Sequence, residues 1–196
     1  MKACITLTNG DRIDPLNIDS NTNVPIEHSA RVLSNTCRFA GHLNTYYSVA
    51  SHSVYASYLI ERYVDVSVKN SYALAALLHE AGGESILGLD FPSPVKGKFS
   101  VYSYGKIRTI SEFEKLSTYA LLDNWGLGHL KSLMDSDVLK KVDNQMCELE
   151  SREFKGQSCL DIDVPDDFEL VDYSPSASYA CFMGRWRELN EKAKET

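Results

Sequence analysis

Two histidines and two carboxylates in this sequence have the residue types and the spacing to hold a metal ion. His52 falls on the apolar stripe of one predicted helix, and Asp143 falls on the apolar stripe of another. His79 and Glu80 stand side by side where a third apolar segment runs into glycines. Because a buried, unpaired carboxylate is costly, Asp143 needs a cation, a metal or a proton beside it.

Each of these positions alone has an ordinary explanation. An inward histidine such as His52 is more often a hydrogen-bonded core residue than a ligand, and the His79-Glu80 pair could simply end a helix at the surface. Three helices that each send such a group inward favour a metal, because mixed nitrogen and oxygen ligands suit a divalent transition ion. We therefore expect one Zn, Co or Mn ion, with additional Mg as an option.

The elements that must position these residues are mainly helices. Apolar residues recurring at intervals of three and four predict helices over residues 25–39, 49–63, 68–80, 108–125 and 137–154, and another after Ser174-Pro175. Glycines and prolines between residues 82 and 100 indicate an irregular loop. Asn9-Gly10, between Ile5 and Ile13, predicts a short hairpin with a type I′ turn.

The fold class that follows is all-α, a helical bundle with a small N-terminal β-hairpin. At 196 residues the chain is expected to form a single domain. We expect residues 1–24 to form the hairpin and lead-in, 25–154 the metal-binding helical core, and 155–196 a connection and the C-terminal helix.

Composition excludes several classes of function. A formal charge of -7 argues against a broad basic surface for long nucleic acid, while a small anionic substrate with a metal remains compatible. The five cysteines are scattered without a CxxC pair, so reduced thiols are expected rather than a disulfide framework or a thiolate zinc site. No apolar run approaches the length of a membrane span. We expect a cytoplasmic protein, in the host cytoplasm if it is phage-encoded.

Around these residues the sequence resembles the HD-domain phosphohydrolases, in particular small phage dATP triphosphohydrolases of the DatZ type and YfbR-like 5′-deoxynucleotidases. The matching segments come in the family's order and are residues 37–42, 47–53, 76–80, 90–96 and 142–143. The resemblance implies a helical HD domain in which His52, His79, Glu80 and Asp143 are the metal ligands. It also implies a homo-oligomer, a dimer or a hexamer.

The chain departs from the family pattern at three places. Glu80 replaces the usual aspartate, and its extra methylene is expected to shift the metal or change how it is coordinated. The following loop is longer by two residues, with Gly82-Gly83 as the insertion, and the family's loop glutamate then maps to Glu84. Ser51 stands where a larger Gln or Glu often precedes the ligand histidine.

The resemblance also suggests roles in catalysis and substrate binding. Glu84 or Asp90 is expected to orient the attacking water or to accept its proton, with loop capping as the alternative. Arg38, Lys96 and His42 are expected to bind phosphate, although Arg38 could instead make a helix-end salt bridge and Lys96 a solvated loop contact.

Phe39 could stack on a purine, and a core role is an equal alternative for this ring. The leading expectation is hydrolysis of dATP to deoxyadenosine and triphosphate. The alternatives are a 5′-deoxynucleotidase acting on deoxynucleoside monophosphates and a degenerate, non-catalytic nucleotide-binding protein. We expect no membrane partner.

Overall fold

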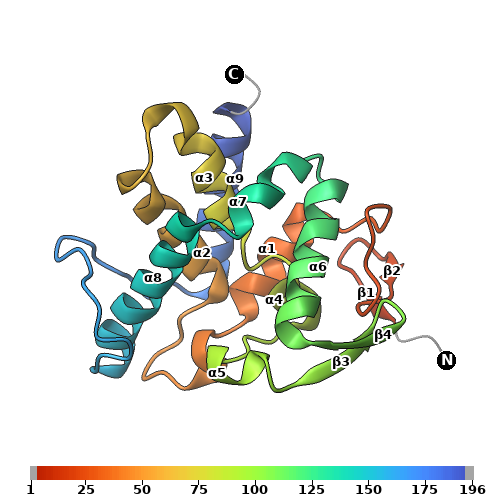
Figure 1. The fold of residues 1–196 in the computed structure, drawn as a ribbon, viewed down its shortest axis with the longest axis horizontal. Coiled ribbons are helices and arrows are strands. Elements are labelled where there is room, and N and C mark those ends of the chain that lie inside the picture. The colour runs from red at the N-terminus through yellow and green to blue at the C-terminus, as the bar shows by residue number, and fades with distance from the viewer. Residues whose placement is uncertain (1–3, 193–196) are drawn as a thin grey trace.

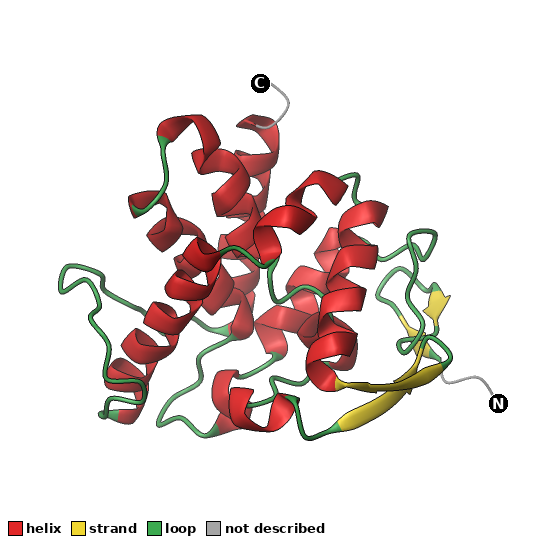
Figure 2. Ribbon diagram, in the orientation of Figure 1, coloured by secondary structure: helices red, strands yellow, loops and turns green. Residues whose placement is uncertain are grey.

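The computed structural model describes residues 4–192 of the chain, which are mostly helical (Figure 1, Figure 2). The helices are α1 (Ile26–Asn35), α2 (Val49–Leu59), α3 (Val66–Leu78), α4 (Gly83–Leu87), α5 (Ser93–Lys96), α6 (Ile110–Asn124), α7 (Lys131–Met134), α8 (Asp137–Lys155) and α9 (Pro175–Lys192). Short 3-10 turns also occur, η1 (Arg38–Gly41), η2 (Ile60–Arg62) and η3 (Gly128–Leu130). The ends of the predicted first and last segments, residues 1–3 and 193–196, lie outside the described residues.

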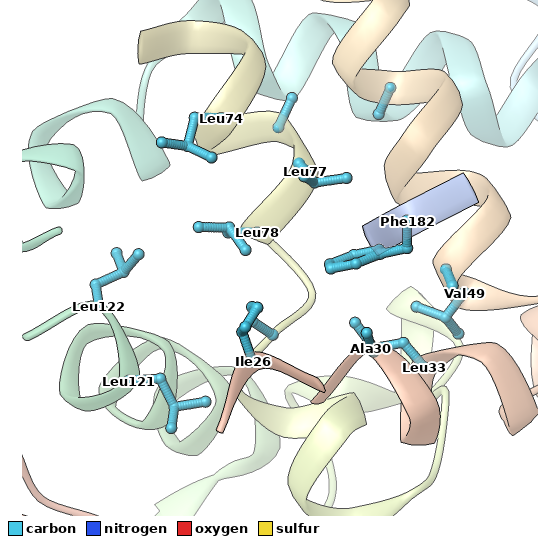
Figure 3. Close-up of a cluster of buried hydrophobic side chains, with 14 of the residues drawn as sticks. Ile26, Ala30, Leu33, Val49, Leu74, Leu77, Leu78, Leu121, Leu122 and Phe182 are labelled. Atoms are coloured by element: carbon cyan, nitrogen blue, oxygen red, sulfur yellow. The ribbon is translucent and has the colours of Figure 1, made fainter. Parts of the chain in front are cut away.

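The apolar core lies where α9 packs against α1, α2 and α3 (Figure 1). Figure 3 shows the fully buried ring of Phe182 near side chains of the other helices, such as Ala30 and Val49. Every residue of α3 from Ala73 to Leu78 is buried, so this helix is covered on all sides and its C-terminal end lies deep in the molecule. Within residues 4–192, no helix combines the length and apolar character that crossing a membrane requires.

Serine caps fix where two of the site-bearing helices begin. Ser48 Oγ accepts the N–H of Ser51 at 3.0 Å at the start of α2, and Ser136 Oγ accepts the N–H of Leu139 at 3.3 Å at the start of α8. Both helices therefore begin at the predicted residue. Ser51 Oγ also lies 2.9 Å from Ser178 Oγ of α9, so a small residue before His52 permits α9 to lie close.

The first predicted helix is too long, because α1 ends at Asn35 and the backbone is extended at Thr36. The next residues form the separate turn η1, in which Phe39 and Ala40 have φ of 55° and 52°. Positive φ is costly for residues that carry a Cβ. The carboxylate of Asp90 accepts the Phe39 N–H at 2.5 Å and so helps to hold this turn.

The segment from residue 82 to residue 100 is not the irregular loop that its glycines and prolines predict. It contains α4 and α5, and only short connections separate them. Gly88, with φ of 66°, ends α4 in the left-handed region, where glycine is the favoured residue. The glycines and prolines therefore bound short helices here.

The described part of the chain contains two antiparallel hairpins, and the sequence predicted one of them. The N-terminal pair β1 (Ile5–Thr6) and β2 (Arg12–Ile13) is confirmed. The type I′ turn predicted for this hairpin is wrong, because Gly10 has a φ of 91° while Asn9 lacks the positive φ that this turn requires. The missed hairpin joins β3 (Ser100–Ser103) to β4 (Lys106–Thr109), and it occupies the first two residues of the predicted helix 108–125.

Gly82 and Gly83 allow α6 to approach the end of α3 closely. A Cβ on Gly82 would overlap the backbone of Glu114 and Thr118, and a Cβ on Gly83 would overlap the side chain of Glu114. The backbone at Glu114 and Thr118 cannot move aside unless α6 itself moves. The two glycines are therefore required by the contact between α4 and α6.

We expect Gly82→Ala to lower the free energy of unfolding by about 1–3 kcal/mol, because the new methyl group forces α6 away. Gly184→Ala is the control, since that glycine is exposed in α9 with open space around it, and it should gain about 0.5–1 kcal/mol from helix propensity. Chemical denaturation of both variants measures the difference. Equal stability of Gly82→Ala and the unmodified chain would contradict the close approach.

Candidate metal centre

Four side chains from three parts of the fold meet at one point. His52 lies in α2, His79 and Glu80 follow α3, and Asp143 lies in α8. One ligand atom of each residue lies within 4.8 Å of all the others. The structure therefore brings together all four residues that the sequence analysis proposes as ligands.

Both imidazoles are oriented by a hydrogen bond at their outer nitrogen. His52 Nδ1 lies 2.7 Å from Glu150 Oε1, and His79 Nδ1 lies 2.6 Å from the carbonyl oxygen of Ala76. Each Nδ1 must donate to its oxygen acceptor, so each Nε2 is left to face the centre. This is the arrangement by which proteins usually orient histidine ligands of metals.

The separations between the facing atoms fit a metal ion. His52 Nε2 and His79 Nε2 are 3.2 Å apart, and Asp143 Oδ1 lies 3.3 Å and 3.6 Å from them. Glu80 Oε1 lies 3.9 Å and 3.7 Å from the same two nitrogens. Ligands placed about 2.0–2.2 Å from a tetrahedral ion stand roughly 3.3–3.6 Å apart. Two nitrogen and two oxygen donors at these separations suit a transition metal.

Asp143 differs in one respect from the expectation that placed it in the core. Its side chain is 45% exposed, because it faces a cavity rather than the apolar interior. Loss of solvent contact around the carboxyl favours its protonated form, but hydrogen bonds with His52 and His79 outweigh this and hold the pKa of Asp143 well below its usual range. The carboxylate therefore stays ionised beside the two imidazoles.

The pKa values of two further candidate ligands, Glu80 and His52, also respond to charged neighbours. Burial raises the pKa of Glu80, but Lys96, His79 and Arg38 outweigh it and lower that pKa to about 2. Burial and the charge of Arg38 lower the pKa of His52, whereas Glu150 and Asp143 raise it, for a net value of about 9. In the metal-free chain a proton on His52 therefore occupies the place that a cation would take.

Arg38 is surrounded by carboxylates. Its Nη1 lies 3.2 Å from Glu80 Oε1 and 3.4 Å from Asp90 Oδ1, and its Nε lies 3.3 Å from Glu150 Oε2. These contacts raise the pKa of Arg38 despite the opposing effect of burial. Arg38 was expected to bind phosphate. In the structure it pairs with the candidate ligand Glu80, with Asp90 and with Glu150, the hydrogen-bond partner of His52.

Glu150 is the residue of this centre that the sequence analysis missed. It is fully buried, and its two carboxylate oxygens accept from His52 and from Arg38. A signal was present, because Glu150 follows Asp143 by seven residues, which is two helical turns and the same face of α8. The apolar residues on the same face of α8 are typical of core packing and obscure this signal.

A second polar cluster lies beside the ligands. Lys96 Nζ contacts Glu84 Oε1 at 2.8 Å and Glu114 Oε2 at 3.1 Å. Burial and the charges of Glu80 and Glu114 raise the pKa of Glu84 well above its usual range, although Lys96 opposes this. Glu84 is therefore favoured as the protonated acid. Glu114 of α6 was not singled out from the sequence, since its contact depends on the close approach permitted by Gly82 and Gly83.

Two cavities border three of the four candidate ligands. One of about 450 Å³ is lined by His79, Glu80 and Asp143 together with Arg38, Phe39, Asp90, Phe91, Lys96 and Lys155. The other, of about 330 Å³, is lined by the same three ligands with Glu84 and Glu114. His42, expected to bind phosphate, is exposed and lies outside both cavities.

Comparison with known proteins identifies a relative but assigns no family. No protein-family model matches the chain. It is 28% identical over 191 residues to YfdR of Escherichia coli strain K12, an uncharacterized protein, and the alignment covers 92% of this chain and 91% of that protein. The likeness extends over nearly the whole of both chains, and the relative's name states no activity.

The raised pKa of His52 predicts that rising pH lowers the stability of the metal-free protein and raises its affinity for a metal ion. The stabilising charge on His52 is complete below its ordinary pKa of 6.5 and is lost as pH rises through about 9. The melting temperature of chelator-treated protein should therefore fall over this range, while its affinity for Zn should rise as the competing proton leaves. Differential scanning fluorimetry and metal titration test this. His52→Gln should lack both trends, and a flat profile in the unmodified chain would refute the assignment.

Glu150→Gln should weaken metal binding by about 10–100-fold, because the partner that orients His52 and balances Arg38 loses its charge. Glu148→Gln is the matched control on the same helix, since that buried carboxylate instead accepts the backbone N–H groups of Cys159 and Leu160. Zn titration of both variants measures the effect. Equal affinities for the two variants would assign Glu150 a purely structural role.

Proposed function

We propose that the chain is a metal-dependent phosphohydrolase of the HD type that acts on a deoxynucleotide. The observation that carries this proposal is that His79, Glu80 and Asp143, three of the four metal-capable residues, line a cavity that also presents cations and aromatic rings. Phosphate recognition needs the cations, and a nucleobase can stack on an aromatic ring. The resemblance of the motif segments to HD-domain phosphohydrolases supports the same reading.

His52, His79, Glu80 and Asp143 would hold the metal, whose chemistry when bound is to polarise a phosphoryl oxygen and to acidify a water for attack on phosphorus. Of the two candidates for proton transfer, Asp90 is committed to contacts with Arg38 and with the N–H of Phe39. It therefore positions η1.

Glu84 faces the smaller cavity with a raised pKa, which suits it to donate a proton to the leaving oxygen. Lys96 holds that acid in place at 2.8 Å.

Charge in the larger cavity favours a substrate with one phosphate. Arg38 already faces three carboxylates, and Lys96 contacts Glu114 as well as the acid Glu84. Among residues 4–192, Lys155 is the lining cation that has no carboxylate within ion-pair distance, and its Nζ lies 3.6 Å from the centroid of the Phe39 ring. A single phosphate needs less additional positive charge than a triphosphate, which supports 5′-deoxynucleotidase activity.

The two cavities together favour dATP as the second candidate. Both border His79, Glu80 and Asp143, so a substrate attacked at the centre could extend into each of them. A nucleoside triphosphate cleaved at its α-phosphate has two such arms, the nucleoside and the triphosphate. The products distinguish the candidates.

Metal-loaded protein should hydrolyse a deoxynucleotide, and His52→Ala and Asp143→Ala should each lose both the metal and the turnover. Chromatography of reactions with dAMP and dATP identifies the products. Phosphate from dAMP indicates the deoxynucleotidase, and triphosphate from dATP indicates the triphosphohydrolase. Stoichiometric metal without any turnover on all the deoxynucleotides would leave a non-catalytic nucleotide-binding protein and refute the proposal.

Lys155→Ala should raise KM for the nucleotide by about 10-fold or more, the cost of one charge-assisted hydrogen bond, while metal content stays unchanged. Lys141→Ala is its matched control, because Lys141 lies in the same helix and contacts the ring of Tyr63 instead. Steady-state kinetics with metal analysis separate the two effects. Identical KM values for the two variants would remove Lys155 from the substrate site.

A further inference from the structure

Two cysteines lie together at the wall of the larger cavity. Cys147 Sγ and Cys159 Sγ are 3.6 Å apart, although the residues belong to α8 and to the connection that follows it. Both thiols line the cavity, and Cys147 lies one helical turn after Asp143. The function proposed above assigns neither of them a role.

The contact between the thiols is built into the fold by a buried carboxylate. Glu148 accepts the backbone N–H groups of Cys159 and Leu160 at 2.9 Å and 2.8 Å, and it is fully buried. Gly156 ends α8 with φ of 71°, which lets the chain reverse and return along the helix. Cys159 is thus held beside Cys147 by backbone contacts that do not depend on the thiols themselves.

We propose that Cys147 and Cys159 form a redox-active dithiol that closes to a disulfide and thereby narrows the substrate cavity. The bond needs the sulfurs to approach from 3.6 Å to about 2.05 Å, which draws residues 156–160 toward α8. Cys159 and Leu160 line the cavity, so this movement shifts its wall. The effect on turnover rests on the proposed function, whereas formation of the disulfide does not.

The two thiols have distinct parts in the reaction. Burial raises the pKa of Cys147 to about 12, whereas Cys159 is exposed and reacts first. Its thiolate attacks a small disulfide such as oxidised glutathione, and one glutathione thiol leaves. Cys147 then loses its proton to solvent and attacks the Cys159 sulfur, which releases the second glutathione. The protein gives up two electrons and two protons, and oxidised glutathione takes them up as two thiols.

The test treats the full-length, metal-loaded protein with oxidised glutathione and maps its peptides by mass spectrometry. A Cys147–Cys159 cross-link is expected, with a higher melting temperature and a loss of turnover that dithiothreitol restores. Cys147→Ser and Cys159→Ser should each lack all three responses relative to their own reduced forms. Cys181→Ser should keep them, because that half-buried thiol lies in α9.

Three results would overturn the proposal. They are a glutathione adduct that persists on Cys159, a cross-link to a different cysteine, and a mapped disulfide with unchanged turnover. If the reduced protein hydrolyses no nucleotide, the proposed function fails by itself. The cross-link and the shift in melting temperature would then still decide whether the dithiol exists.

Discussion

The fully buried carboxylate of Glu150 connects the candidate ligand His52 to Arg38. One of its oxygens lies 2.7 Å from His52 Nδ1 and the other lies 3.3 Å from Arg38 Nε. A buried charge is tolerated only when paired, so the carboxylate, the imidazole and the guanidinium depend on one another. Through Arg38 the same network reaches Glu80 and Asp90. One residue of α8 thus contacts both the candidate ligand of α2 and the first residue of η1.

That network explains how two consecutive residues with positive φ can persist in η1. Phe39 and Ala40 adopt a conformation that would be unfavourable in isolation. Asp90 accepts the Phe39 N–H, while Arg38 pairs with the other oxygen of the same carboxylate. The strain is thereby offset by contacts to a buried ion pair, and the Phe39 ring is presented to the cavity beside Lys155.

The sequence predicted the parts of the structure that depend on local pattern. The starts of α2 and α8 follow from serine caps and periodic apolar residues, and the four candidate ligands follow from polar residues at apolar positions and from the matching motifs. Glu114 could not be predicted, because its place beside Lys96 depends on how closely α6 packs against Gly82 and Gly83. Long-range packing of this kind leaves no local signal.

Turn chemistry accounts for the remaining errors in the fold. Asn-Gly pairs favour type I′ turns, yet Gly10 alone carries positive φ and the hairpin loop is longer. The hairpin turn with two positive φ values lies instead at Tyr104-Gly105, between β3 and β4, where φ is 49° and 78°. A tyrosine is a poor indicator of that conformation. In the structure the Tyr104 N–H donates to Asn17 Oδ1, so a contact with the N-terminal segment stabilises what the local sequence does not.

Glu80 and the Gly82-Gly83 pair are best understood together. The glutamate places one oxygen 3.2 Å from Arg38 Nη1 and also within 4 Å of both histidine nitrogens, so it serves as an ion-pair partner and as a candidate ligand. An aspartate would be shorter by one methylene and would have to give up part of that reach. The glycines bring Glu114 against Lys96, and Lys96 in turn helps to keep Glu80 ionised. The candidate ligand and the two glycines that follow it therefore act on the same buried charges.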